Sequence, residues 1–206
     1  MADLAFISGF LNESGVEGKR QTRAYVPARP HNFTGAKRQN PHLFTAIGAS
    51  GITIATGVDL GQTSAAELAA YGLEPALGLR LSPWLGLKRK AAIEKLAAMP
   101  LTISEDFAAS LDHAVHGGYL ARHVRPAFER ASGASFDSLP RQAQAVIFSC
   151  CYQKGCGGVA RDWPRLWSCL IRQDWQAASR ELLTGFRQYV GRRRKEGLLL
   201  ATLGRT

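Results

Sequence analysis

Two carboxylates in the N-terminal part of the chain are spaced so that they could work together. Glu17 lies where an amphipathic first segment ends at Gly18, and Asp59 directly follows a short run of β-branched residues. No other Asp or Glu occurs at positions 18–58, although this stretch holds several Lys and Arg. Hydrolysis of an acetal needs one carboxylic acid that protonates the leaving oxygen and a second carboxylate that activates water or attacks the sugar. The pair therefore indicates glycoside hydrolysis.

The surroundings of the two carboxylates predict different roles for them. Glu17 follows a largely apolar helix, so partial burial should raise its pKa and let it act as the acid. Asp59 lies on a polar turn and should stay ionised as the base, while the hydroxyl of Thr53 could orient the attacking water. On these residues alone an alternative stays open, in which Asp59 only caps the amides of Gln62 or Thr63 in a hairpin.

The segment that carries Thr53 and Asp59 reads GITIATGVDLGQ, from position 51 to position 62. In it Ile52 and Ile54 alternate with Thr53, which predicts a strand with one face on a core and one face offering hydroxyls. Three glycines mark positions where the backbone needs a positive φ or where another group approaches closely. They are Gly51, Gly57 and Gly61.

The whole chain predicts an α+β fold that is mostly helical, in a single catalytic domain over residues 1–206. A first helix is expected over about residues 3–17 and a small antiparallel β lobe over about residues 18–63. Helical periodicity and capping signals follow, so a larger helical lobe is expected over about residues 64–206. Three short stretches should supply the strands: Tyr25–Val26, Phe44–Ile47 and Ile52–Thr56.

Composition favours a polyanionic partner and argues against a membrane protein. The 206 residues include 26 basic and 16 acidic side chains, a formal net charge of +10. Such a balance suits nucleic acid, an anionic membrane surface or an acidic wall polymer. No apolar run reaches the ~18 residues of a membrane span, and the first residues do not resemble a secretory signal. We therefore expect synthesis in the cytoplasm and no stable membrane insertion. Five basic residues should form a basic surface near the first carboxylate: Lys19, Arg20, Arg23, Lys37 and Arg38.

Cysteine and histidine spacing does not predict a metal centre, and we expect no cofactor. Four cysteines are present, without the two closely spaced pairs of a zinc site. We expect buried, reduced thiols, with a Cys156–Cys169 disulfide as the alternative. His113 and His116 lie three apart on a predicted helix but have no evident third ligand. The cysteines are Cys150, Cys151, Cys156 and Cys169.

Several of these motifs resemble the phage T4-type lysozymes, and more closely their pesticin-like branch of bacterial toxins and phage muramidases. Val16-Glu17-Gly18 is similar to the family's "EG" after the first helix, and residues 51–62 are close to its "GVTIGTGxDLGQ". Weaker similarity covers nearly all of the remaining chain. It includes Ala24–Pro27, Leu101–Ser104, Phe136–Gln144, Tyr152–Gly155 and the arginine-rich Arg192–Leu198.

This resemblance implies a two-lobed lysozyme fold. It also implies an enzyme that cleaves the β-1,4 bond between N-acetylmuramic acid and N-acetylglucosamine. It makes Glu17 the general acid, Asp59 the carboxylate that activates water and Thr53 the residue that positions this water. In the T4-type enzymes the second carboxylate precedes the threonine; here no acid does, as in the pesticin-like order. Two departures are Ala55, where glycine is common, and a long basic loop at residues 27–44.

The same resemblance implies peptidoglycan glycan strands as the partner. We expect a monomer and no nucleic-acid partner, with an immunity or inhibitor protein as a possible second partner. A phage endolysin released by a holin, a secreted antibacterial effector and a domain of a larger toxin would all fit. In each case the protein would act in the periplasm or cell wall.

Three rival interpretations remain. A non-catalytic module that binds nucleic acid or wall polymer would use the basic residues Arg192–Lys195, although no recognisable nucleic-acid motif accompanies them. A serine hydrolase is suggested by Gly48–Gly51, but the spacing is not GxSxG. A lytic transglycosylase would cut the same bond with the acid alone. Asp59 and Thr53 favour hydrolysis over that last alternative.

Overall fold

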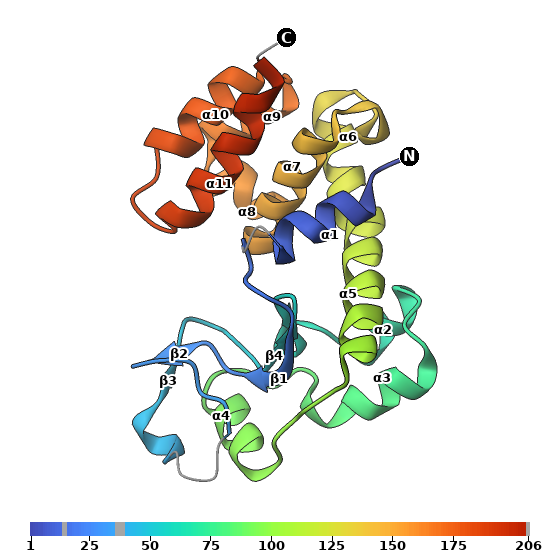
Figure 1. Cartoon of the computed structure of the whole chain (residues 1–206), viewed down its shortest axis with the longest axis vertical. Helices are drawn as coiled ribbons and strands as arrows, with labels where there is room; N and C mark the ends of the chain where they lie inside the picture. The colour runs from blue at the N-terminus through green and yellow to red at the C-terminus, as the bar shows by residue number, and fades with distance from the viewer. Residues whose placement is uncertain (14–15, 36–39, 205–206) are drawn as a thin grey trace. The chain divides into compact units, whose positions relative to one another are not determined.

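The chain packs into two compact units in the computed structural model, which describes residues 1–13, 16–35 and 40–204 (Figure 1). The first unit comprises Met1–Val16 and Tyr119–Thr206, and the second comprises Glu17–Gly118. Helices dominate, with a few short antiparallel strands, so the predicted α+β, mostly helical class is confirmed. The units divide the chain differently from the expected lobes, because the helical segments within residues 65–118 group with the strands, and residues 1–16 group with the later helices.

The second unit holds a three-stranded antiparallel sheet in the order β1-β4-β5. Its strands are β1 (Gln21–Tyr25), β4 (Thr53–Ala55) and β5 (Val58–Asp59). Two further strands, β2 (Ala28–Arg29) and β3 (Thr45–Ala46), pair with each other. Strand β4 is buried along its whole length, Thr53 included, whereas its alternating Ile and Thr residues predicted one buried face and one face that offers hydroxyls. The helices of this unit are α2 (Ala65–Ala70), α3 (Pro75–Leu81), α4 (Arg89–Ala98) and α5 (Glu105–Tyr119), with short 3-10 turns at η1 (Pro41–Leu43), η2 (Leu60–Gln62) and η3 (Ser82–Trp84).

Local sequence signals explain where these helices begin. Ser64 caps α2 in a capping box with Glu67, as predicted. Helix α5 begins with Glu105 and Asp106 in its first turn, where carboxylates interact favourably with the helix dipole. One face of α5 carries Phe107 and Leu111 into the core, together with the buried polar residues discussed below.

The first unit is entirely helical in the part that the structure describes, and it is built around α7 (Arg141–Lys154). This helix is buried along most of its length and packs against α1, α8 and α11. The other helices are α1 (Leu4–Asn12), α6 (Arg125–Ser132), α8 (Cys156–Asp162), α9 (Pro164–Ile171), α10 (Trp175–Thr184) and α11 (Val190–Ala201), with short turns at η4 (Leu120–Val124), η5 (Phe136–Ser138) and η6 (Thr202–Gly204). Helix α10 packs along α11 (Figure 1).

Helix α1 is shorter than predicted. It ends at Asn12, and the backbone N–H of Glu13 closes its last turn on the carbonyl of Gly9. Glu17 therefore lies in a bend beyond the helix, as the first residue of the second unit. Residues 14 and 15, which the predicted helix included, lie outside the described residues.

The cysteines agree in part with the expectation of buried thiols. All four are free, so the alternative Cys156–Cys169 disulfide is not formed. Cys150 and Cys151 are fully buried in α7, whereas Cys156 and Cys169 are only partly buried. Within the described ranges, no helix combines the length and the apolar character needed to cross a membrane.

Candidate active site

The sheet of the second unit places Tyr25, Thr53 and Asp59 in one row. Tyr25 of β1 pairs with Thr53 of β4, and Thr53 pairs in turn with Asp59 of β5. Residues directly opposite each other on antiparallel strands project to the same face of a sheet. A phenol, a hydroxyl and a carboxylate therefore share one face. Thr53 and Asp59 lie close together in the sequence, so their proximity was predictable. Tyr25 is distant in the sequence and comes next to them through the pairing of β1 with β4.

Backbone amides on both sides of Asp59 hold its carboxylate. Oδ1 accepts a hydrogen bond from the N–H of Gly61 at 2.8 Å, and Oδ2 accepts one from the N–H of Gly51 at 3.2 Å. The side-chain amide of Gln62 donates to the carbonyl of Ala49 at 2.8 Å. Asp59 thus caps the turn η2, but through the N–H of Gly61, whereas the capping alternative named the amides of Gln62 or Thr63. The cap fixes the orientation of the carboxylate. A side chain on Gly51 or Gly61 would collide with Asp59 and with the carbonyl of Leu87, so both glycines serve a close approach.

Burial changes the acid–base character of Asp59. Removal from solvent raises the pKa of this carboxyl, while the hydrogen bonds from Gly51, Gly61 and Gln62 lower it in part. The sequence predicted a polar, solvated turn and so did not anticipate this upward shift. A carboxylate with a raised pKa is a stronger proton acceptor once it is ionised. The arrangement therefore suits a general base.

The negative charges of both candidate carboxylates affect the pKa of Tyr25. Burial raises the pKa of its phenol, and the negative charges of Glu17 and Asp59 raise it further. The phenol therefore remains protonated and able to donate a hydrogen bond near the two carboxylates. Glu17 itself is half-buried, and its side chain lies against the turn between β4 and β5, since a Cβ atom at Gly57 would come within 3.0 Å of its Oε2.

The contact between Gly57 and Glu17 predicts the effect of a single added methyl group. Gly57 has φ 74°, a backbone conformation that costs an alanine about 1–2 kcal/mol. Gly57→Ala should lower stability by this amount and also displace the Glu17 side chain, which lowers activity about tenfold or more. Thermal melting and the initial rate of glycan cleavage measure the two effects.

Gly72→Ala provides the matched control for this variant. Gly72 has φ 80°, and no atom lies within 4 Å of the position that its Cβ would take. It should lose similar stability and keep its activity. Equal losses of activity in both variants would show that backbone strain alone, and not contact with Glu17, is responsible.

The basic surface predicted beside Glu17 is only partly present. Lys19 and Arg23 are exposed, as expected. Arg20 is not a surface cation, because its Nε donates to Oδ2 of the buried Asp112 at 2.8 Å. Lys37 and Arg38 lie outside the described residues. Sequence reasoning missed Asp112; the available signal was an acid directly after Leu111 on a helix with a buried face.

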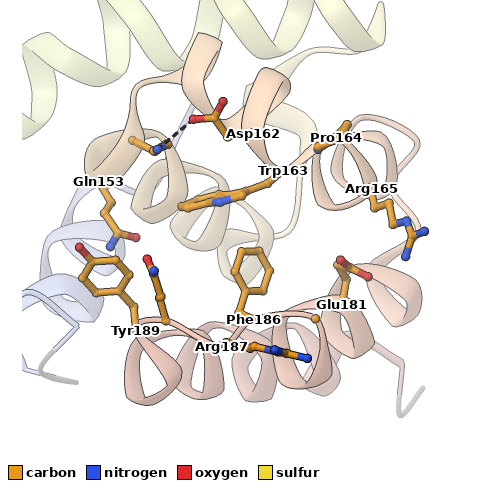
Figure 2. Close-up of a pocket in the computed structure, with 12 residues that line it drawn as sticks. Gln153, Asp162, Trp163, Pro164, Arg165, Glu181, Phe186, Arg187 and Tyr189 are labelled. Atoms are coloured by element: carbon orange, nitrogen blue, oxygen red, sulfur yellow. Dashed lines mark ion pairs between the residues drawn. The ribbon is translucent and has the colours of Figure 1, made fainter.

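A separate cavity of about 720 Å³ lies in the first unit (Figure 2). The ring of Trp163 extends across it with Phe186 nearby, and the buried guanidinium of Arg193 lies 4.6 Å from the Trp163 ring centroid. Its Asp162 pairs with Lys154 and Arg161, which hold the pKa of that carboxyl below its ordinary value. Asp162 therefore stays ionised and is no proton donor. Despite its size, this cavity supplies less acid–base chemistry than the sheet face does, so we place the candidate active site on the sheet.

Among residues 1–13, 16–35 and 40–204, no three His, Cys, Asp or Glu side chains gather in a way that could hold a metal ion. His113 is exposed and His116 is buried, so the two histidines that share α5 face different surroundings.

Comparison with known families assigns the chain to a family. A family model described as "Pesticin: Bacterial toxin homologue of phage lysozyme, C-term" matches residues 6–176. The matched range contains Glu17, Thr53 and Asp59, and most of both units. No curated protein matches the chain with significant similarity. Because the family model spans far more than half of the sequence, the chain belongs to the pesticin family of bacterial toxin homologues of phage lysozyme.

Proposed function

We propose that the protein is an N-acetylmuramidase that hydrolyses the β-1,4 bond between N-acetylmuramic acid and N-acetylglucosamine in peptidoglycan. Family membership makes it a lysozyme homologue with a wall-degrading, glycosidase type of activity in general. The observation that supports the specific reaction is the row of Tyr25, Thr53 and Asp59 on one sheet face, with Glu17 against the adjoining turn.

The proposed reaction uses two carboxylates and one water molecule. Glu17 donates its proton to the glycosidic oxygen as the bond to the anomeric carbon breaks. The oxygen of a water oriented by Thr53 bonds to that carbon, and Asp59 takes the proton that the water gives up. Transfer of that proton through solvent to Glu17 restores both groups. The raised pKa of Asp59 supports its role as acceptor.

The surface of α11 argues against a purely binding function. Arg192 and Arg193, half of the basic run expected to grip a polyanion, are buried and ion-paired with Glu196 at 3.1 and 2.5 Å. Glu196 also accepts a hydrogen bond from Ser149 at 2.5 Å. These two arginines hold α11 on α7 and are not available to an external polymer. The interpretation as a basic binding module therefore loses half of the basic run on which it rested.

The products of peptidoglycan digestion separate hydrolysis from its nearest rival. The purified wild-type protein should release soluble muropeptides with reducing N-acetylmuramic acid ends, read by mass spectrometry. A lytic transglycosylase uses no water and would instead release 1,6-anhydro ends. Anhydro products would contradict the assignment of Asp59 as the base. Binding to the wall without release of any fragment would favour the binding module.

The setting of this activity follows from its substrate. Peptidoglycan lies outside the cytoplasmic membrane, so the protein would act in the periplasm or wall after release by a holin or delivery by a secretion system. A monomer suffices for this chemistry, because all the residues that we assign to the reaction come from one chain. An immunity or inhibitor protein would protect the producing cell in the toxin setting.

A further inference from the structure

Asp112 is a buried carboxylate on α5 that binds the turn between β4 and β5. Its side chain is 3% exposed. Oδ1 accepts a hydrogen bond from the N–H of Thr56 at 2.8 Å, and Oδ2 accepts one from the hydroxyl of Thr56 at 2.7 Å. The Nε of Arg20 also donates to Oδ2, at 2.8 Å. A buried carboxylate is retained at a large desolvation cost unless such partners surround it. Asp112 therefore joins Thr56 and Arg20 firmly.

His116 lies one helical turn after Asp112 and is fully buried. Burial lowers the pKa of its imidazole, as do the charges of Arg20 and His113, while the charge of Asp112 and the backbone of Thr56 oppose this shift. His116 therefore lies in the same buried surroundings, but the hydrogen bonds from α5 to the N–H and the hydroxyl of Thr56 come from Asp112.

Thr56 and Arg20 belong to the two segments that carry the candidate active site. Thr56 lies in the turn between Thr53 and Asp59, next to Gly57, against which the Glu17 side chain lies. Arg20 follows Glu17 by three residues and leads into β1. The β1–β4 pairing also joins the two segments. A single helical turn of α5 fixes both.

We propose that Asp112 is a positioning residue that holds the β4–β5 turn and the Glu17 segment in the geometry that catalysis requires. The proposal rests on the muramidase function proposed above. Asp112 does not act on the substrate; it acts through Thr56 and through Arg20. Displacement of a reacting group by about 1 Å lowers the rate by about 100-fold. Loss of this anchor should therefore appear mainly in kcat and leave KM nearly unchanged.

Two conservative pairs of variants test the proposal. Thr56→Val removes the hydroxyl that Asp112 binds but keeps the backbone N–H and the shape, and Thr56→Ser keeps the hydroxyl. Asp112→Asn removes the buried charge, and Asp106→Asn makes the same change at an exposed position of α5. We expect kcat for peptidoglycan cleavage to fall at least about tenfold in Thr56→Val and Asp112→Asn, with KM within about threefold of wild type. Thr56→Ser and Asp106→Asn should remain close to wild type.

The assay temperature must lie below every melting transition, so that all variants are folded. If Thr56→Val and Asp112→Asn melt earlier but retain the wild-type kcat, the anchor serves stability alone and the proposal is wrong. A rise in KM at constant kcat would also contradict it, because it would place the residues in substrate binding.

A second measurement does not depend on activity. The carboxyl carbons of Glu17 and Asp59 can be followed by ¹³C NMR as pH is changed. In Thr56→Val their chemical shifts or titration midpoints should move, and in Thr56→Ser they should match wild type. Unchanged carboxyl signals in Thr56→Val would overturn the positioning role. If the wild-type protein released no muropeptides, the proposed function would fail, and the NMR comparison would still decide whether the anchor sets the geometry of the two carboxylates.

Discussion

Replacing Glu17 with glutamine should lower kcat for peptidoglycan hydrolysis by about 10³-fold. The amide has nearly the same shape as the acid but no proton to give to the leaving oxygen, and general acid catalysis of this kind contributes about 10²–10⁴-fold. KM should change little, because the side chain keeps its size and its place against Gly57. Initial rates of muropeptide release, measured over a range of peptidoglycan concentrations, separate the two constants.

Glu13→Gln is the matched control for this variant. Glu13 lies four residues earlier, at the exposed end of α1, where its side chain faces solvent. The same chemical change there should leave kcat within about twofold of wild type, as is usual for a surface substitution. A Glu17→Gln protein that kept more than a tenth of the wild-type rate would rule out Glu17 as the acid.

Replacing Asp59 with asparagine should also lower kcat by about 10³-fold, but for a different reason. The amide cannot accept a proton from the attacking water, so the second half of the reaction loses its base. Circular dichroism must confirm the native fold, because Asp59 also accepts hydrogen bonds from Gly51 and Gly61. If this variant stayed active and released anhydro muropeptides, the enzyme would be a transglycosylase with Glu17 alone as its catalytic carboxylate.

The pH dependence of the wild-type enzyme also tests whether Asp59 is the base. Burial raises the pKa of Asp59 above the ordinary value of 3.8. As pH falls through this raised pKa the base becomes protonated, so kcat/KM should decline on the acid side with a midpoint above 3.8. The same shift also affects stability, since the stabilisation from protonated Asp59 is complete below 3.8 and is lost as pH rises through the raised pKa. An acid limb at or below 3.8 would exclude Asp59 as the group that controls it.

Sequence alone predicted the parts of the site that are local along the chain. Thr53 and Asp59 lie six residues apart in one motif, and a tight turn between alternating residues leaves few ways to pair them. The mostly helical fold was also predictable, because capping signals and apolar periodicity are local features. The end of α1 was not, since Gly15 and Gly18 are both helix stop signals and the sequence does not rank them.

Residues that reach the site through pairing or packing were not predictable. Tyr25 joins the row through the β1–β4 register, which depends on a bulge that no short sequence pattern specifies. Arg20 resembled the other surface cations, and only the fold places it against Asp112. His116 was noted for its spacing from His113, whereas the relevant spacing is to Asp112, four residues before it.

The close contact between Gly51 and Gly61 beside Asp59 affects how the motif at residues 51–62 should be interpreted in related sequences. Gly51 and Gly61 lie against each other, and any side chain on either would collide with the other glycine, with Asp59 or with the Leu87 carbonyl. A need for these two glycines therefore follows from backbone packing and would remain in a relative that had lost its catalytic side chains. The glycines of the GITIATGVDLGQ segment thus report the shape of the fold. Activity in a relative must instead be judged from the residues that correspond to Glu17, Thr53 and Asp59, of which Glu17 lies outside that segment.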